Sequence, residues 1–135
     1  MAKPRKEFRV RLPLYVSPHM AWRRKILDAI REAQHRTPVT YLASDRLELS
    51  VLFYMKNRVA EIHDVDNRLK DVMDALQGRM GGSKSIKPHA PVIHNDRQVW
   101  RVAVEKKEPP KQSQDGGYLT VRRLKFRELS RKRTQ

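Results

Sequence analysis

The segment from His63 to Lys70 combines acidic and basic side chains at short intervals. Two carboxylates, Asp64 and Asp66, stand two positions apart, and Lys70 follows about one helical turn later. Residues i and i+2 of an extended segment point to the same side, so both carboxylates could face one hard cation. Mg²⁺ binds a few carboxylate oxygens and keeps several waters. The pattern therefore predicts a Mg²⁺ site, with Mn²⁺ as a possible substitute.

The same residues also allow a purely structural interpretation. Asp66 or Asn67 could cap a helix that begins there. Lys70 could pair at the surface with Asp66 and with Asp74, since residues four apart share one face of a helix. Two aspartates separated by one residue are a weak motif, so both interpretations stay open at this point.

A further acid, Asp96, stands directly before a strand that we expect to start near Gln98. Acids at strand ends and helix starts converge readily in a mixed sheet, which predicts that Asp96 joins Asp64 and Asp66 around the metal. The alternative is an ordinary turn before a strand. His63 and His94 neighbour the two acidic segments, and we expect both to be neutral and either hydrogen-bonded or solvated.

The charge balance points to a polyanionic partner. The 135 residues include 30 Lys and Arg against 15 Asp and Glu, which gives a formal net charge of +15. Contact with phosphates relieves the self-repulsion of such a chain, although a solvated cationic surface is the simpler alternative. With no cysteine, disulfides, thiolate zinc sites and cysteine nucleophiles are excluded. Neither a signal-peptide pattern nor an apolar run of about 18 residues is found, so we expect a cytoplasmic protein without membrane contact.

Hydrophobic periodicity supplies the elements that must position these residues. Alternating apolar residues predict strands, and apolar residues at helical spacing predict two amphipathic helices. Ser17 is the expected cap of the first helix, with Pro18 at its first position. Gly78 and the following glycines end the second. The expected elements are a strand over 8–14, a helix over 18–36, a strand over 47–55, a helix from 66 or 67 to about 80, and strands over about 98–106 and 118–126.

This order predicts an α/β (α+β) fold in which two main helices pack on a mixed sheet of about four strands. We expect the last two strands to form a hairpin with a long loop. Trp22 and Trp100 fall on apolar faces and are expected in the core. Residues 1–127 form a single expected domain, and 128–135 a basic, disordered tail.

Two blocks of fixed residues resemble the RusA family of Holliday-junction resolvases. They read Asp64-x-Asp66-Asn67-x-x-Lys70-x-x-x-Asp74-Ala75-Leu76 and Asn95-Asp96-x-Gln98-Val99. The resemblance implies that Asp64, Asp66 and Asp96 bind the metal and that Lys70 is catalytic. Two departures are present. The family often has an acid where Asn95 stands, and the interval of 20 residues from Leu76 to Asp96 is longer than expected.

The resemblance also implies a function. RusA-like proteins are small homodimeric endodeoxyribonucleases of bacteria and their phages. They cut four-way DNA junctions by paired symmetric nicks in recombination and repair, which would place this chain at the nucleoid. We expect basic residues of the N-terminus, the 79–87 loop and the tail to bind phosphates. The alternative is a basic, non-catalytic DNA- or RNA-binding protein whose acids only cap and pair.

Overall fold

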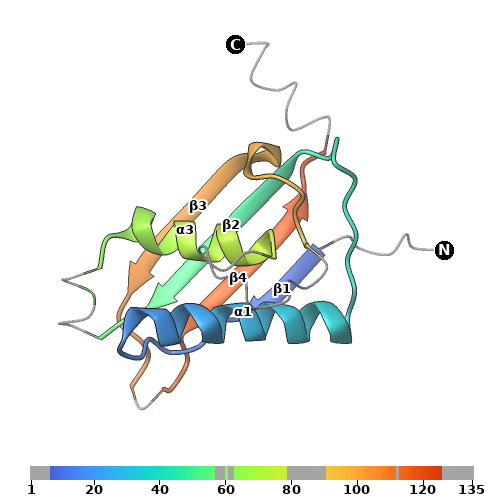
Figure 1. Cartoon of the computed structure of the whole chain (residues 1–135). Helices are drawn as coiled ribbons and strands as arrows, with labels where there is room; N and C mark the ends of the chain where they lie inside the picture. The colour runs from blue at the N-terminus through green and yellow to red at the C-terminus, as the bar shows by residue number, and fades with distance from the viewer. Residues whose placement is uncertain (1–6, 57–59, 61–62, 79–90, 112, 126–135) are drawn as a thin grey trace, which may run out of the picture.

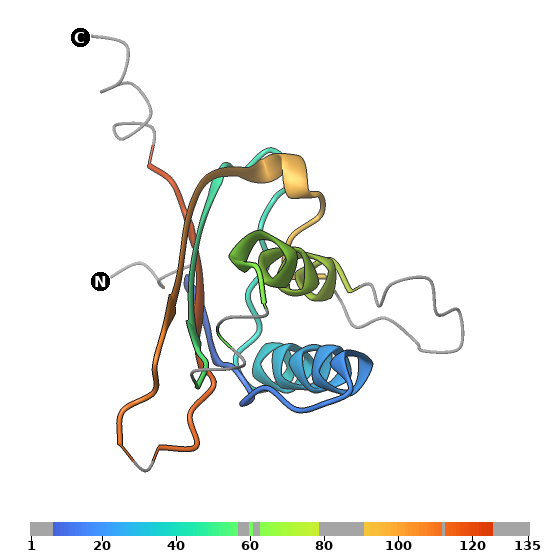
Figure 2. The same ribbon diagram turned by 90° about the vertical axis from the view of Figure 1, so that its left-hand side faces the viewer.

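The computed structural model describes residues 7–56, 60, 63–78, 91–111 and 113–125. They form a four-stranded mixed sheet with two helices packed on one face (Figures 1 and 2), so the expected α+β fold is confirmed. The elements in chain order are β1 (Glu7–Arg11), α1 (His19–Arg36), β2 (Leu47–Tyr54), α3 (Val65–Leu76), the 3₁₀ turn η1 (Asp96–Gln98), β3 (Val99–Lys107) and β4 (Gly117–Arg123).

The strand order is β1-β4-β2-β3, which contradicts the expected hairpin. β2 and β3 are parallel neighbours, whereas β4 runs antiparallel between β1 and β2. Parallel strands need a long crossover, and α3 lies in the crossover from β2 to β3. After β3 the chain crosses β2, and β4 pairs with β2 on one side and with β1 on the other. Periodicity identified each strand but carries no information about which strand lies beside which.

The core lies between the sheet and the two helices. β2 alternates buried and half-buried residues along its whole length, as its pattern predicted. Trp22 on α1 is 1% exposed, and its ring centroid lies 6.0 Å from that of Phe53 on β2. The expected burial of Trp22 is therefore confirmed. Full burial of a large apolar side chain stabilises a fold by about 1.5–3 kcal/mol, so residues of this kind hold α1 on the sheet.

Trp100 does not belong to the core, contrary to expectation. Its side chain is 57% exposed, and the guanidinium of Arg46 lies 4.2 Å from its ring centroid. β3 is an edge strand that pairs only with β2 among the described strands, so its side chains meet fewer neighbours than those of a central strand. The apolar alternation of β3 was a true strand signal, but it did not mean burial.

Both helices differ from expectation at their starts. Pro18 is the N-cap of α1 rather than its first helical residue. The N-cap of α3 is Asp64, which lies two residues before Asp66 and three before Asn67, the two expected caps. Gly78 follows α3 with a φ of 77°, a left-handed conformation that suits glycine after a helix, as expected. The strand bounds differ from expectation by a few residues, most at the C-terminal ends of β1 and β4. The expected loop over 79–87 and the basic tail lie outside the described residues.

Candidate acidic site at the start of α3

Asp64 and Asp66 both lie exposed at the N-terminal end of α3. The side chain of Asp64 makes no capping bond. Among the described residues its one hydrogen-bond partner is the Asn67 amide, at 3.4 Å between Nδ2 and Oδ2. Asp66 has no hydrogen bond or ion pair with any residue that the structure describes. The fold therefore leaves both carboxylates available to a ligand. The positive end of the helix dipole favours such acids by up to about 1 kcal/mol, which is their structural role.

Lys70 is exposed one turn beyond Asp66 on α3. The structural interpretation of the sequence expected it to pair with Asp66 and Asp74, and no such pair occurs among the described residues. Asp74 instead lies 3.5 Å from the guanidinium of Arg23 on α1. Because no neighbour holds the Lys70 ammonium, it remains able to approach a phosphate bound at the start of the helix.

Asp96 is the first residue of η1, and its side chain is exposed. The residues around it hold the turn. The Asn95 side chain accepts a hydrogen bond from the Arg97 amide at 2.8 Å, and the Gln98 side chain accepts one from the His94 amide at 2.7 Å. Asn95, the residue that departs from the RusA pattern, thus caps this turn. Asp96 is the one acid of the second block, and its side chain makes none of the hydrogen bonds that hold this turn in the described residues.

Within one chain, Asp96 lies far from Asp64 and Asp66. The carbonyl next to Asp64, that of His63, accepts a hydrogen bond from Lys106 Nζ at 2.9 Å, near the end of β3. Asp96 precedes the start of the same strand. Val99 and Lys106 stand seven positions apart, so at about 3.3 Å per residue roughly 23 Å separates them.

The C-terminal end of α3 supports the same placement. The Leu76 carbonyl, in the last residue of the helix, accepts hydrogen bonds from the amides of Val92 and Ile93, shortly before Asp96. Two oxygens that bind one Mg²⁺ lie within roughly 4 Å of each other. Accordingly, no three His, Cys, Asp or Glu residues of the described part of the chain form a group that could hold a metal ion. The structure brings Asp64, Asp66 and Lys70 to one helix end and leaves Asp96 elsewhere.

The sequence did not reveal a buried polar cluster between α1 and α3. Asp71 is 8% exposed, and its carboxylate lies 2.8 Å from His19 Nε2, 3.1 Å from Arg23 Nε and 3.5 Å from Arg68 Nε. Only the Arg68–Asp71 spacing of three residues could have suggested part of this cluster. Its other members come from a helix about 50 residues earlier, so no local pattern shows the contact. These ion pairs join the two helices beside the exposed acids.

The rings of His63 and His94 both contact other parts of the chain. His94 Nε2 lies 2.8 Å from the Tyr41 carbonyl, and the ring of His63 lies 4.4 Å from that of Tyr15. His63 Nε2 is buried and has no hydrogen-bond partner in the described part of the chain. Burial first, and then the positive charge of Arg68, lowers the pKa of His63 below its usual 6.5. His63 is thus held neutral beside Asp64.

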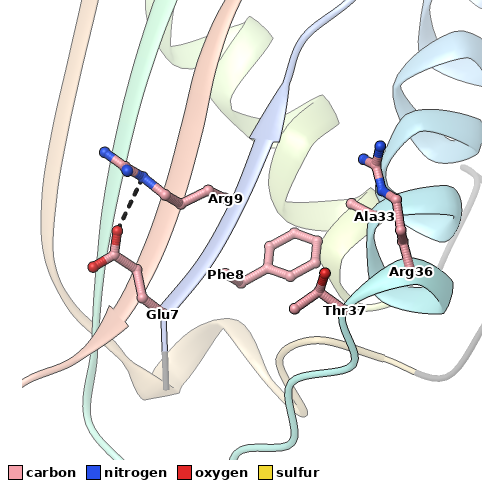
Figure 3. A pocket seen from close by; sticks show the side chains of 6 residues that line it. All are labelled: Glu7, Phe8, Arg9, Ala33, Arg36 and Thr37. Carbon is pink, nitrogen blue, oxygen red and sulfur yellow. Dashed lines mark ion pairs between the residues drawn. The ribbon is translucent and has the colours of Figure 1, made fainter. Parts of the chain in front are cut away.

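The hollow between β1 and the end of α1 offers no comparable chemistry (Figure 3). It has a volume of about 220 Å³, smaller than the usual 300–1,000 Å³ of a small-molecule site. Its one acid, Glu7, already pairs with Arg9 at 3.0 Å. The exposed acids of α3 therefore remain the stronger candidate for a functional site.

Comparison with known proteins does not assign the chain to a family. No protein-family model matches the chain, and no curated protein matches its sequence. In the part of the chain that the structure describes, none of the helices is long and apolar enough to cross a bilayer. The features that point to a function are therefore the charge of the chain, the geometry of its acids and the two RusA-like blocks.

Proposed function

We propose that this protein is a metal-dependent endodeoxyribonuclease that resolves Holliday junctions by paired, symmetric nicks in recombination and repair. One observation carries the proposal. On a chain of net charge +15, Asp64 and Asp66 are exposed together at the start of α3, and the fold does not use their carboxylates. The RusA-like order of Asp64, Asp66, Lys70 and Asp96 supports the same function.

The oxygen donors of Asp64 and Asp66 suit Mg²⁺ or Mn²⁺. Mg²⁺ commonly binds one or two carboxylates and completes its shell with waters and substrate phosphate. When bound, such an ion lowers the pKa of an attacking water and offsets negative charge on the reacting phosphate. Asp64 and Asp66 would hold the ion at the helix end. Lys70, one turn further on, would orient the phosphate and stabilise the charge that develops on it.

Asp96 fits this site only if a second copy supplies it, because roughly 23 Å of β3 lies between the two groups within one chain. A homodimer with two-fold symmetry presents the same patch twice, so each copy's Asp96 could approach the other copy's Asp64 and Asp66. Two equal sites also match a four-way junction, whose two cut strands are equivalent. Paired nicks would then leave duplexes with 5′-phosphate and 3′-hydroxyl ends.

DNA binding itself would come from the cationic surface. Lys and Arg side chains bind phosphates with little sequence discrimination. The affinity falls steeply as the salt concentration rises, because releasing counterions from the DNA then gains less free energy. The proposed partner is therefore branched DNA, chiefly the four-way junction. A preference for a particular cutting sequence would need a few contacts with base edges.

A junction-cleavage assay tests the function. Wild-type protein should nick opposite strands of a labelled four-way junction with Mg²⁺ or Mn²⁺ and not with EDTA. Asp64→Asn should still bind the junction and lose cleavage, while Asp28→Asn, at an exposed acid of α1, should cut normally. If the wild type cuts no branched DNA with either ion, the enzyme proposal is wrong.

A mixing experiment tests whether the two acidic groups come from different copies. Asp66→Asn and Asp96→Asn are each expected to be inactive alone. If each site uses two copies, a dimer of one Asp66→Asn copy and one Asp96→Asn copy holds one intact site, made of Asp66 from one copy and Asp96 from the other. Variants that are folded together should then regain nicking of one strand. If a site uses one chain, every site in the mixture lacks an acid and nicking stays absent.

The alternative is a basic DNA- or RNA-binding protein without catalysis. One observation favours it, namely that the described residues of one copy do not assemble three metal ligands. On this alternative Asp64 and Asp66 serve only the helix end. Junction binding that responds to neither Mg²⁺ nor Asp64→Asn, without any cleavage, would support it.

A further inference from the structure

The two edges of the sheet are built differently. β3 forms one edge, nine residues long, and carries Trp100 at 57% and Val102 at 42% exposure. β1 forms the other edge, five residues long, and carries the strongly exposed Arg9 and Arg11. Short, charged edges resist pairing with another chain, whereas long, apolar edges promote it. Figure 2 looks onto β3, and no described helix or strand crosses in front of it.

At this edge the backbone groups of β3 have no strand partner among the described residues. The Met55 amide donates a hydrogen bond to the Lys107 carbonyl, so the backbone groups of Lys107 face β2. Successive residues of a strand direct these groups to opposite sides. The irregularity in the β2–β3 pairing lies at the start of the strands, before Val102. The amides and carbonyls of Val102 and Val104 therefore face the free edge.

We propose that a second copy of this chain pairs its β3 antiparallel with this β3 about a two-fold axis near Ala103. In this register Val102 lies opposite Val104 of the second copy, and the two exchange backbone hydrogen bonds. Arg101 lies opposite Glu105 of the second copy, and opposite charges across a strand pair stabilise it. The exposed Ala103 falls on the axis, where a small side chain lets the strands approach.

The neighbouring registers fit less well. Moving the axis to Val104 would set Arg101 opposite Lys107 of the second copy, and like charges in that position destabilise a pair. Moving it to Val102 would lose the Arg101–Glu105 match. The charges of β3 thus select the register centred on Ala103, on a protein whose overall charge of +15 otherwise opposes self-association.

The proposed pairing has a consequence that rests on the proposed function. It sets Trp100 of one copy opposite Lys106 of the other. Lys106 bonds the carbonyl next to Asp64, and Asp96 lies four residues before Trp100. The Asp96 end of each copy would therefore lie beside the Asp64 end of the other. Strand pairing at β3 would supply the second copy that the metal site requires.

Cysteine crosslinking tests the interface without reference to activity. The chain has no cysteine, so Ala103→Cys introduces a single thiol. Facing residues at such a position have Cα atoms about 4.5 Å apart, within the range of a disulfide. Mild oxidation of the full chain should convert Ala103→Cys into a covalent dimer on a non-reducing gel. Thr120→Cys, on the same sheet but away from the edge, should stay monomeric on the gel.

Light scattering coupled to gel filtration provides the second measurement. The wild type should be a dimer, and Val102→Lys should be a folded monomer by circular dichroism. Met20→Lys, which places the same change at an exposed apolar residue of α1, should remain a dimer. Glu105→Arg should weaken the dimer, because it would set two arginines opposite each other in the strand pair.

The outcomes separate the interface from the function. A monomeric wild type, or a dimer that neither crosslinks through Ala103→Cys nor responds to Val102→Lys, would overturn the β3 interface even if the protein cuts junctions. Crosslinking and dissociation as expected, without any cleavage of branched DNA, would leave the interface standing and refute the nuclease. If Val102→Lys changes junction binding but not the oligomeric state, the edge contacts DNA, and the proposed dimer is wrong.

Discussion

Helix α3 carries two kinds of aspartate. Asp71 is buried and lies in ion-pair contact with His19, Arg23 and Arg68, whereas Asp66, little more than one turn earlier, is exposed and has no described partner. A bonded acid holds the structure together, and removing it leaves cations uncompensated. An exposed acid costs the fold little and keeps its oxygens free for a ligand. The same residue type thus marks stability at one place and candidate chemistry at the other.

The same contrast recurs in η1. Gln98 is buried and bonds four backbone groups, while Asp96, two residues earlier, has none of these contacts. Each RusA-like block therefore contains a residue that the fold needs beside one that it does not. Variants at these residues separate the two roles.

Asp66→Asn should separate function from stability most strongly. Loss of a ligand that anchors a catalytic ion removes several kcal/mol of transition-state stabilisation, so junction cleavage should fall roughly a thousand-fold. The urea midpoint should change little, because Asp66 makes no described contact. Single-turnover cleavage and urea titration on the same preparation check both expectations. Loss of stability with cleavage retained would reverse the roles assigned to the two aspartates.

Asp71→Asn should have the opposite profile. Removing one partner of a buried charge cluster leaves Arg23 and Arg68 without compensation, which should lower the free energy of unfolding by about 3 kcal/mol. Urea unfolding followed by circular dichroism measures the change, with Asp28→Asn as the exposed control. A change no larger than that of the control would show that the cluster does not hold α1 against α3.

Gln98→Ala should test the contrast in the second block. It removes a buried side chain and leaves the partly buried His94 amide and Leu42 carbonyl without their hydrogen bonds of 2.7 and 2.8 Å. We expect a loss of about 2 kcal/mol in unfolding free energy. Arg97→Ala, at the exposed residue between Asp96 and Gln98, should change stability by less than about 0.5 kcal/mol. Equal effects of the two variants would remove the distinction.

The smallest effect should come from His63. Its pKa in the folded protein lies below the usual 6.5, so the unfolded chain binds more protons as the pH falls past that value. The stability due to neutral His63 is complete above pH 6.5 and is lost as the pH falls through the folded pKa. Between pH 7.5 and pH 5 the unfolding free energy of the wild type should therefore fall more steeply than that of His63→Phe. The difference in slope should correspond to the uptake of a fraction of one proton on unfolding. Parallel profiles would show that His63 is not held neutral.

Local patterns predicted the elements well and their neighbours poorly. The alternation of β2 placed its end within one residue, and the helical spacing of α1 placed its end at Arg36. The position of β4 beside β1 was missed, as was the exposure of Trp100, because both depend on which distant segments meet. Hydrophobic period reports one buried face of an element, not its location in the sheet.

The candidate site divides in the same way. Asp64, Asp66 and Lys70 lie on one helix end because they are close in sequence, and their proximity could be predicted. The distance to Asp96 depends on the path of α3 and β3, and the sequence expectation that these acids converge does not hold within one chain. The contacts of Asp71 with His19 and Arg23 bridge about 50 residues, so no spacing rule could find them.

The place of β4 in the sheet also constrains how the chain can fold during synthesis. β4 is the last of the described strands to be synthesised, yet it lies between β1 and β2 in the sheet. It is also the only described strand with which β1 pairs. Until β4 leaves the ribosome, β1 has no strand partner and one side of β2 stays open. The completed sheet therefore depends on contacts between segments more than 100 residues apart, a topology that folds slowly and leaves strand edges open to wrong pairing in the meantime.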